Sequence, residues 1–514
     1  MNKRIPVLLA LLMSVTALLQ GAACSSCDCQ ATDQTFLWLR TPYQLNSPER
    51  LALSRGFMSR GGDVLNGQLY VTIFGGRSTR SSHLAQYFFP NCREALNVTE
   101  SVTPTTDILA NNINIFTQEG ISGTGPGFAS TIAIHPRHTF VGAGLTYRQE
   151  FARRCNGRKF WFELSAPIIT VRNNINFEEC ITNAGGGVAT GFTGAFANAT
   201  EAFSSPEWLF GRMDDCRHKK TKLGDLEVIL GYELIEQEAT HAEAYIGAIF
   251  PTGNRPKGRT VFEPIVGRNK HWGLLSGTSF GTELWHNCDD TRAVWMEFDI
   301  SGEYLFSRRE VRSFNLKNRP FSRYTYVYCT QEAAQAAADA ATAGDVATAR
   351  TAGTPGINLF TQCVKVKPYL NSTINSALIY TSCNLQLEGG YNFFTKQAEC
   401  VRLDTNFLPV SAVRAATGGG ATNNVQQIGN DYDGVNDLPV ALYAENIITA
   451  ADLDLRSAAS PSQFIHTFYG AVGYTWSFWP RFLPTTSLGG SYEYTQTNTA
   501  LDRWMVWGKM AFLF

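Results

Sequence analysis

The chain has 514 residues, a formal net charge of −1 and only 17% charged residues, against about 25% in typical soluble domains. A net charge this close to zero gives no sign of a basic surface that binds nucleic acid, so no nucleic-acid partner is expected. Aromatic residues make up 12% of the chain and glycine occurs 45 times. This mixture is typical of strands that face lipid on one side and water on the other.

The first residues have the layout of a secretory signal. Lys3 and Arg4 precede an apolar run over residues 5–19, which ends in small residues. We therefore expect residues 1–23 to be a signal peptide that is removed from the mature chain. Cys24 follows directly, so lipidation of its thiol is an alternative. The position three residues earlier is a glycine, however, where lipoprotein signals usually carry leucine.

The body of the chain alternates between apolar and polar residues with period two, which is the pattern of β-strands. The clearest segments are residues 226–234, 294–306 and 464–478. Several reach ten or more residues, which is longer than the roughly five or six of soluble strands and suits a tilted strand that crosses a bilayer. Beyond the signal, no apolar run approaches the roughly 18 residues of a membrane-spanning helix.

A sheet in lipid must close, because hydrocarbon offers no partner to an unpaired backbone N–H or C=O group. The pattern therefore predicts an all-β fold, a transmembrane antiparallel β-barrel of about 12–16 strands with 14 as the central value, over residues 66–514. Residues 24–65 are expected to be an N-terminal extension. The least periodic region, residues 24–137, could equally hold a plug or the first strands.

Three irregular stretches interrupt the alternation, and we expect long loops at about 181–222, 330–363 and 401–463. A short helix is expected near 199–212. The second stretch is rich in alanine, the residue of highest helix propensity, and predicts a short helical insert.

An exported chain meets an oxidising compartment, so disulfides are the expected state of its cysteines. Cys329 and Cys363 flank the alanine-rich insert and form the candidate disulfide, which would staple that loop. Cys24, Cys27 and Cys29 are close enough to suggest metal ligands, but no matching cysteine or histidine pair follows them. A structural zinc site needs four well-spaced ligands, so no metal and no cofactor are expected.

The final residues, from 504 to 514, alternate down to Phe512 and Phe514. This segment resembles the closing strand of Gram-negative outer-membrane β-barrel proteins, a porin-like family, which typically ends in phenylalanine with an aromatic residue two positions earlier. Gly508 departs from the bulky alternation. The resemblance implies an outer-membrane location, outer-membrane lipid as surroundings, and a role for Phe512 and Phe514 as the signal read by the barrel assembly machinery.

Acidic residues are abundant on the strand faces opposite the apolar ones, while bases such as Arg148, Arg503 and Lys509 are few. If the apolar faces meet lipid, these acids line the lumen, and rings of carboxylates favour cations. The alternative is that they pair with arginines of the loops or stay hydrated. The lumen-lining candidates are Asp225, Glu227, Glu233, Glu297, Asp299, Glu303 and Glu493, with Glu163, Glu243 and Glu388 on the same faces.

One enzyme-like string, residues 277–281, matches G-x-S-x-G around Ser279. A nucleophile elbow needs a strand, a sharp turn and a helix, whereas both flanks have the pattern of strand. His286 is near in sequence, but this says little about triad geometry. No enzyme activity is expected.

Two functions remain open at this stage. The first is a porin-like channel for small polar solutes or ions, weakly cation-preferring. The second is a non-conducting structural or adhesive barrel, whose disulfide-stapled loops bind a ligand on a host or neighbouring cell.

Overall fold

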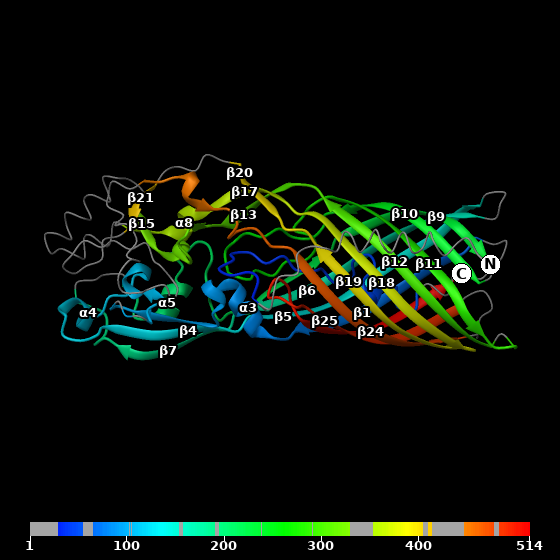
Figure 1. Ribbon diagram of the computed structural model, residues 1–514, viewed down its shortest axis with the longest axis horizontal. Coiled ribbons are helices and arrows are strands. Elements are labelled where there is room, and N and C mark those ends of the chain that lie inside the picture. The colour runs from blue at the N-terminus through cyan, green and yellow to red at the C-terminus, as the bar shows by residue number, and fades with distance from the viewer. Residues whose placement is uncertain are drawn as a thin grey trace.

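The computed structural model (Figure 1) describes residues 29–54, 65–101, 103, 105–153, 158–190, 195–237, 239–289, 291–328, 353–404, 410–413, 447–476 and 483–514. The predicted signal peptide, Cys24, most of the predicted alanine-rich insert, Cys329 and most of the third predicted loop lie outside these residues. Among the described residues, no helix is both long enough and apolar enough to cross a membrane.

Twelve long antiparallel strands form a closed barrel. Each pairs with the next around the ring, and pairing of β5 with β6 completes the circle. The predicted all-β barrel is confirmed, with twelve strands instead of the central value of 14. The strands are β1 (Gly67–Ser78), β5 (Arg137–Arg153), β6 (Lys159–Asn174), β9 (Leu226–Gln237), β10 (Thr240–Phe250), β11 (Gly273–His286), β12 (Arg292–Leu305), β18 (Tyr369–Ser382), β19 (Leu385–Lys396), β24 (Gln463–Thr475), β25 (Leu483–Tyr494) and β26 (Arg503–Leu513).

A thirteenth strand, β8 (His218–Leu223), lies in a segment that the sequence predicts as loop. It pairs with β6 in nearly the register of β9, so that β8 and β9 act as one strand interrupted at Gly224 and Asp225. The short polar run of β8 shows weak alternation, and its pairing with β6 holds it extended. This strand lengthens the barrel wall beyond the end of β9.

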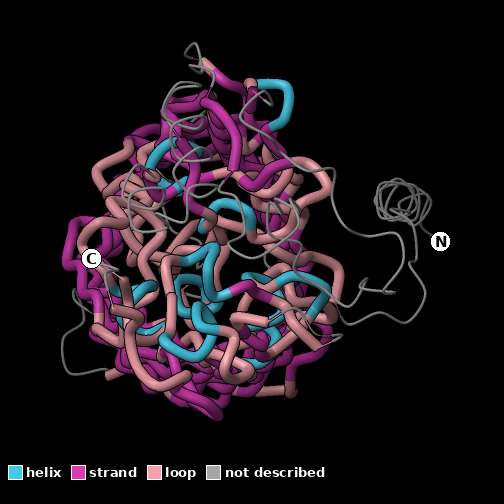
Figure 2. Tube along the Cα trace, turned by 90° about the vertical axis from the view of Figure 1, so that its left-hand side faces the viewer, coloured by secondary structure: helices cyan, strands magenta, loops and turns pink. Residues whose placement is uncertain are grey.

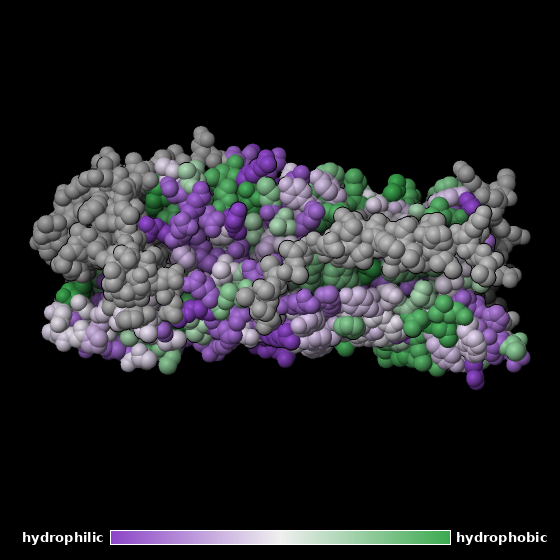
Figure 3. All heavy atoms as spheres, viewed as in Figure 1, coloured by the Kyte–Doolittle hydropathy of each residue, from purple (hydrophilic) through white to green (hydrophobic). Residues whose placement is uncertain are grey.

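The outer surface of the barrel carries the apolar residues that the alternation predicts. Ile246 and Leu488 are 67% exposed, and Ile73 and Phe468 are more than 60% exposed. Leaving each such side chain in water forgoes roughly 1.5–3 kcal/mol of burial, so this surface is suited to lipid. Figure 3 shows apolar patches on the barrel half of the molecule, and others on the cap side.

The two ends of the barrel differ. At the end where β26 finishes, the strands are joined by short turns, such as residues 238–239 between β9 and β10 and residues 383–384 between β18 and β19. At the other end the connections are long. Because barrels have short periplasmic turns and longer extracellular loops, we call these the inner and the outer end.

The long connections fold together into a cap over the outer end (Figures 1 and 2). The cap has its own aromatic-rich apolar core, which includes Phe203, Trp208, Phe321 and Tyr324, and a second apolar cluster around Phe314 and Phe360. Its elements are the strands β2 (Ala95–Thr99), β3 (Ile108–Leu109), β4 (Phe128–Ile134), β7 (Phe177–Ala184), β13 (Arg308–Ser313), β14 (Asn315–Leu316), β15 (Tyr326–Tyr328), β16 (Thr354–Pro355), β17 (Thr361–Lys367), β20 (Cys400–Leu403), β21 (Val410–Val413), β22 (Ile447–Ile448) and β23 (Leu453–Asp454), and the helices α3 (Ser81–Phe88), α4 (Gln118–Ser122), α5 (Ala199–Ser204) and α8 (Gly356–Phe360). The helix expected near 199–212 is thus the short α5.

Candidate lumen plug and pore

Residues 29–54, which we call the plug segment, run through the barrel from the outer to the inner end. At the outer end, the backbone amides of Gln30 and Ala31 both donate to Asn498 Oδ1 at 3.0 Å, in the β25–β26 connection. At the inner end, Gln68 Nε2, at the start of β1, donates to the carbonyl of Ser54 at 3.0 Å. The chain therefore enters the lumen from the cap and leaves it on the opposite side.

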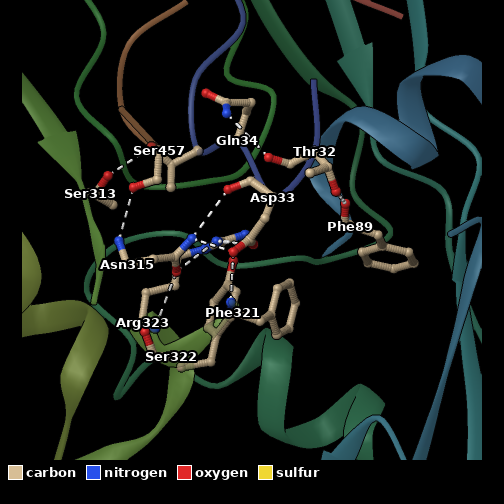
Figure 4. A network of polar contacts seen from close by, with 12 residues as sticks. Thr32, Asp33, Gln34, Phe89, Ser313, Asn315, Phe321, Ser322, Arg323 and Ser457 are labelled. Carbon is tan, nitrogen blue, oxygen red and sulfur yellow. Dashed lines mark hydrogen bonds and ion pairs between the residues drawn. The ribbon is translucent and has the colours of Figure 1, made fainter. Parts of the chain in front are cut away.

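The outer part of the plug segment is anchored to the cap by Asp33 (Figure 4). Its carboxylate accepts from Arg323 Nη1 at 2.8 Å, from Asn315 Nδ2 at 2.6 Å and from the amide of Phe321 at 2.8 Å. Burial nevertheless raises the pKa of Asp33, against the opposing effect of Arg323. A disulfide between Cys29 and Cys92 adds a covalent link. Cys29, considered above as a metal ligand, is thus bonded to another cysteine.

The middle of the plug segment meets the strands of the barrel wall. Arg40 Nη1 lies 3.2 Å from Glu493 Oε1, and its Nη2 donates to Asn392 Oδ1 at 2.9 Å. The hydroxyls of Tyr43 and Thr146 lie 3.0 Å apart. All these side chains are buried, so charged and polar groups of the plug segment are desolvated against the wall.

The inner part of the plug segment forms the one-turn helix α2 (Pro48–Leu51). Ser47 precedes the helix in an extended conformation and Pro48 occupies its first position, where proline's fixed φ suits a helix start. This turn directs Arg50 at the wall, where its guanidinium pairs with Glu227 and, at 2.5 Å, with Glu163.

Charged side chains of the wall form hydrogen bonds with the backbone carbonyl and amide groups of this turn. Lys509 Nζ donates to the carbonyls of Arg50 at 2.9 Å and Ala52 at 2.5 Å, and Glu388 accepts from the amide of Leu53 at 2.7 Å. The plug segment is thus held by side chains from several strands, far apart in the sequence.

A second arginine, Arg268, reaches the lumen from the connection between β10 and β11. Gly267, with a φ of +84°, makes the turn that precedes it, and a Cβ there would lie 2.7 Å from Asp225. Arg268 Nη2 then lies 2.6 Å from Glu227 and 2.5 Å from Glu303.

The seven predicted lumen acids thus fall into separate groups. Asp225, Glu227 and Glu303 surround Arg268. Glu493 lies between Arg40 and Arg503. The other three are apart from these: Glu297 lies 3.2 Å from His241, Asp299 accepts from Ser279 and Asn375, and half-buried Glu233 accepts from the amide of Lys159.

Ser279, the serine of the G-x-S-x-G string, lies within β11 and faces Asp299 in the lumen. His286 lies at the end of the same strand, where it contacts Glu283. The elbow that the motif would need is therefore replaced by continuous strand.

Beside the plug segment, toward the inner end, the lumen keeps a cavity of about 480 Å³, counted with its opening. Asn46 and Arg50 of the plug segment line it together with Tyr70, Glu163 and Tyr245 of the wall. Leu45, Trp161 and Ile229 also line this space, so its walls are mixed, and it can hold water.

The closing strand β26 has the facing that its sequence predicts. Trp504, Val506 and Met510 are exposed on the lipid side, while Met505, Trp507 and Lys509, which alternate with them, are buried. The strand seals the barrel by pairing with β1, and Phe514 exchanges two backbone hydrogen bonds with Gly67. The assembly role of Phe512 and Phe514 remains a prediction, as does the Cys329–Cys363 pair, of which only the exposed Cys363 is described.

The plug arginines were not identified from the sequence, and Arg268 was covered only in general terms, by the alternative that the acids pair with arginines of the loops. Residues 38–51 are a short, aperiodic stretch in which two arginines and two prolines break any strand or helix pattern. The one available signal was the excess of acids on the inward strand faces, which requires bases from elsewhere.

No family model matches the chain, and no curated protein matches it. Among solved structures, an outer-membrane channel from Pseudomonas putida F1 is similar at 7% identity and a TM-score of 0.38, with 88% of this chain and 99% of that chain covered. The transport unit of an autotransporter from Escherichia coli is similar at 5% identity and a TM-score of 0.31, with 90% and 95% covered. The translocator domain of an autotransporter from Neisseria meningitidis is similar at 7% identity and a TM-score of 0.28, with 89% and 90% covered.

The assignment of the fold rests on the geometry of the chain itself. It combines a closed barrel of an even number of strands, an apolar outer surface and short turns at one end only. These are the features of bacterial outer-membrane barrels, whose closure satisfies every backbone group in lipid. The protein is therefore a closed antiparallel β-barrel with the architecture of a membrane-spanning barrel.

Proposed function

We propose that the protein is an outer-membrane channel for small polar solutes, whose lumen is closed at rest by its own plug segment. The observation that carries the proposal is the polar contact between plug and wall: Arg40 and Arg50 are buried against Glu493, Glu227 and Glu163. If the plug segment only had to fill the lumen, apolar packing would stabilise it as much as these ion pairs do, because desolvation offsets most of the attraction within a buried ion pair.

A polar interface has a different advantage, because water can solvate both of its surfaces once they separate. The carboxylates of the wall and the guanidinium groups of the plug segment then regain hydration, which limits the cost of opening. An apolar interface of the same area would lose about 25 cal/mol for every Å² exposed to water. The charges therefore support a plug that can move.

Withdrawal of the plug segment would also change the charge of the lumen. Arg40, Arg50 and Glu49 leave, while Glu163, Glu227 and Glu493 stay on the wall, so the lumen loses two positive charges and one negative charge. Glu227 and Glu493 keep Arg268 and Arg503 as partners. Glu163 loses its ion-pair partner, so the open pore gains free negative charge, and carboxylates in a pore wall favour cations.

Planar-bilayer recording tests the proposal. The wild-type protein is expected to stay mostly closed, and a variant lacking residues 29–54 to conduct steadily with a preference for potassium over chloride. Adding Glu163→Gln to that variant should reduce the preference. As a matched control, Arg309→Ala with Asp404→Ala removes an exposed ion pair of the cap and should record as wild type.

Closure of each barrel is checked by its altered mobility on unheated denaturing gels. If the deletion variant forms a closed barrel and still does not conduct, the channel proposal fails. Because deletion can impair folding, the double variant Arg40→Ser, Arg50→Ser serves as a second test and should show brief openings.

A non-conducting surface barrel is the second candidate function. The cap favours it, because its two apolar cores and the Cys29–Cys92 disulfide make the outer connections a folded unit and not a set of separate loops. Such a unit could present a binding surface to a host or neighbouring cell. This function is favoured if neither the wild type nor the plug variants conduct, and if cells bearing the protein adhere more than cells with an empty vector.

A further inference from the structure

Four neighbouring strands of the barrel wall end in an outward basic residue at the outer end. We call these residues, Arg77 of β1, Arg137 of β5, Arg172 of β6 and Lys219 of β8, the basic quartet. All four are exposed. The strand register places three of them at one level, because Arg77 and Arg172 both lie opposite Thr139, and Arg172 lies opposite Lys219. Arg137 lies two residues further out on β5, opposite Asn174.

The same order of residue types recurs on each of the four strands. Going outward along the lipid face, an apolar residue is followed by a small or hydroxyl residue and then by the base. The four series are Ile73, Gly75, Arg77; Val141, Thr139, Arg137; Ile168, Thr170, Arg172; and Leu223, Thr221, Lys219. On every strand, one small or hydroxyl residue therefore separates the base from the apolar residue below it.

The outer rim of the other strands carries aromatic residues instead. Exposed examples are Trp272, Tyr304, Phe464, Tyr492 and Trp504. Aromatic girdles mark the level at which a membrane barrel meets the lipid headgroups. The four basic strands lack such residues at the corresponding outward positions, so bases replace aromatics at headgroup level on one side of the barrel only.

The basic quartet is not neutralised by the protein. None of its members forms an ion pair within the described part of the chain. The intervening threonines pair with the neighbouring strand, as Thr170 and Thr221 do at 2.8 Å between their hydroxyls. Four positive groups therefore face the headgroup layer without a protein counter-charge.

We propose that the basic quartet binds the phosphate groups of an outer-leaflet lipid, whose acyl chains lie along Ile73, Val141, Ile168 and Leu223. Guanidinium groups bind phosphate in a bidentate manner, and basic groups at a membrane surface attract anionic headgroups. Because the apolar surface directly below needs an acyl partner, a lipid fits this patch better than a free anion does.

Binding of diphosphorylated lipid A in detergent micelles to the full-length protein tests the proposal, with the dephosphorylated glycolipid as comparison. The wild type should prefer the phosphorylated form by at least about tenfold, since each basic group contributes measurably at an anionic surface. The variant Arg77→Gln, Arg137→Gln, Arg172→Gln, Lys219→Gln should lose that preference.

A matched control neutralises four exposed bases of the cap, with Arg255→Gln, Lys257→Gln, Arg259→Gln and Lys365→Gln, and should bind as wild type. Barrel closure is checked on unheated gels for each variant. Equal binding by the quartet variant and the wild type would overturn the proposal. So would displacement of the lipid by millimolar inorganic phosphate, which would identify a general anion site.

Discussion

At the scale of single residues, the lumen contains buried charged groups whose ion-pair partners lie far away in the sequence. Arg50 bridges two strands through Glu163 and Glu227, while Arg268 bridges Glu227 and Glu303. Glu227 therefore connects Arg50 of the plug segment to Arg268. Removing one member of such a buried network leaves an uncompensated charge, which costs far more than the network itself contributes.

We predict that Arg50→Ala releases the plug segment. The substitution leaves the buried Glu163 without its ion-pair partner, while Glu227 keeps Arg268, and it should cost the plugged state about 3–5 kcal/mol. Single-channel recording should show openings at least a hundredfold more frequent than in the wild type. Arg309→Ala, which breaks an exposed pair with Asp404, should leave the frequency unchanged. An unchanged frequency in Arg50→Ala would show that its ion pairs do not hold the plug.

A second residue-scale prediction concerns pH. In the cap, burial opposes ionisation of Glu310, but Arg312 and His271 lower the pKa of its carboxyl below the usual 4.5. A carboxyl with a lowered folded-state pKa stabilises the fold above its unfolded value and loses that contribution as the pH falls. Protease susceptibility of the cap should therefore rise as the pH falls from 4.5 toward the lower folded-state pKa of Glu310.

Glu310→Gln removes this titrating group and should flatten that part of the profile. The variant should also be more susceptible at neutral pH, because Arg312 loses one of its two carboxylate partners. A profile with the same steepness as the wild type would assign the acid sensitivity to other carboxyls.

At the scale of elements, the direction of the plug segment is the informative feature. Its first described residue, Cys29, is bonded to Cys92 in the cap, whereas its last, Ser54, meets the start of β1 at the inner end. Because the plug segment begins in the cap and then descends, Cys29 must have been carried to the outer side during assembly.

We predict that an epitope inserted before Cys29 is recognised by antibody on intact cells. The same epitope inserted between Cys288 and Asp289, in the short turn between β11 and β12, should be recognised only after the outer membrane is permeabilised. Recognition of the first epitope only after permeabilisation would reverse the assigned direction of the plug segment or of the barrel.

At the scale of the whole molecule, closure of the barrel depends on the seam between its first and last strands. β1 and β26 pair over eleven residues, and Phe514 reaches one residue beyond β26 to bond Gly67. The ring stays open until this seam forms, although the other strand pairs can form between chain neighbours.

We predict that Phe514→Ala lowers the amount of closed barrel in the outer membrane severalfold, although the backbone bonds to Gly67 can still form. A loss in the cell with normal refolding in detergent would assign the side chain to recognition by the assembly machinery. Met510→Ala, an exposed change on the same face, is the control. Equal amounts of closed barrel in the outer membrane for the two variants would contradict a special role of the terminal phenylalanine.

The sequence by itself determined which face of each strand meets lipid, because side-chain alternation is local and needs only the neighbouring residues. It also predicted the barrel, since apolar strands of this length in lipid must close. The facing of Glu227, Val506 and Leu230 could therefore be read without coordinates.

Only the tertiary structure decided the strand number, the cap and the plug. Residues 38–51 have no period of their own, and their conformation is set by partners such as Glu227 and Glu493, which lie 177 and 453 residues away from Arg50 and Arg40. Likewise, the polar run of β8 is extended only because β6 offers it a free edge. Contacts of this range depend on closure of the whole ring, and no local pattern of residues encodes them.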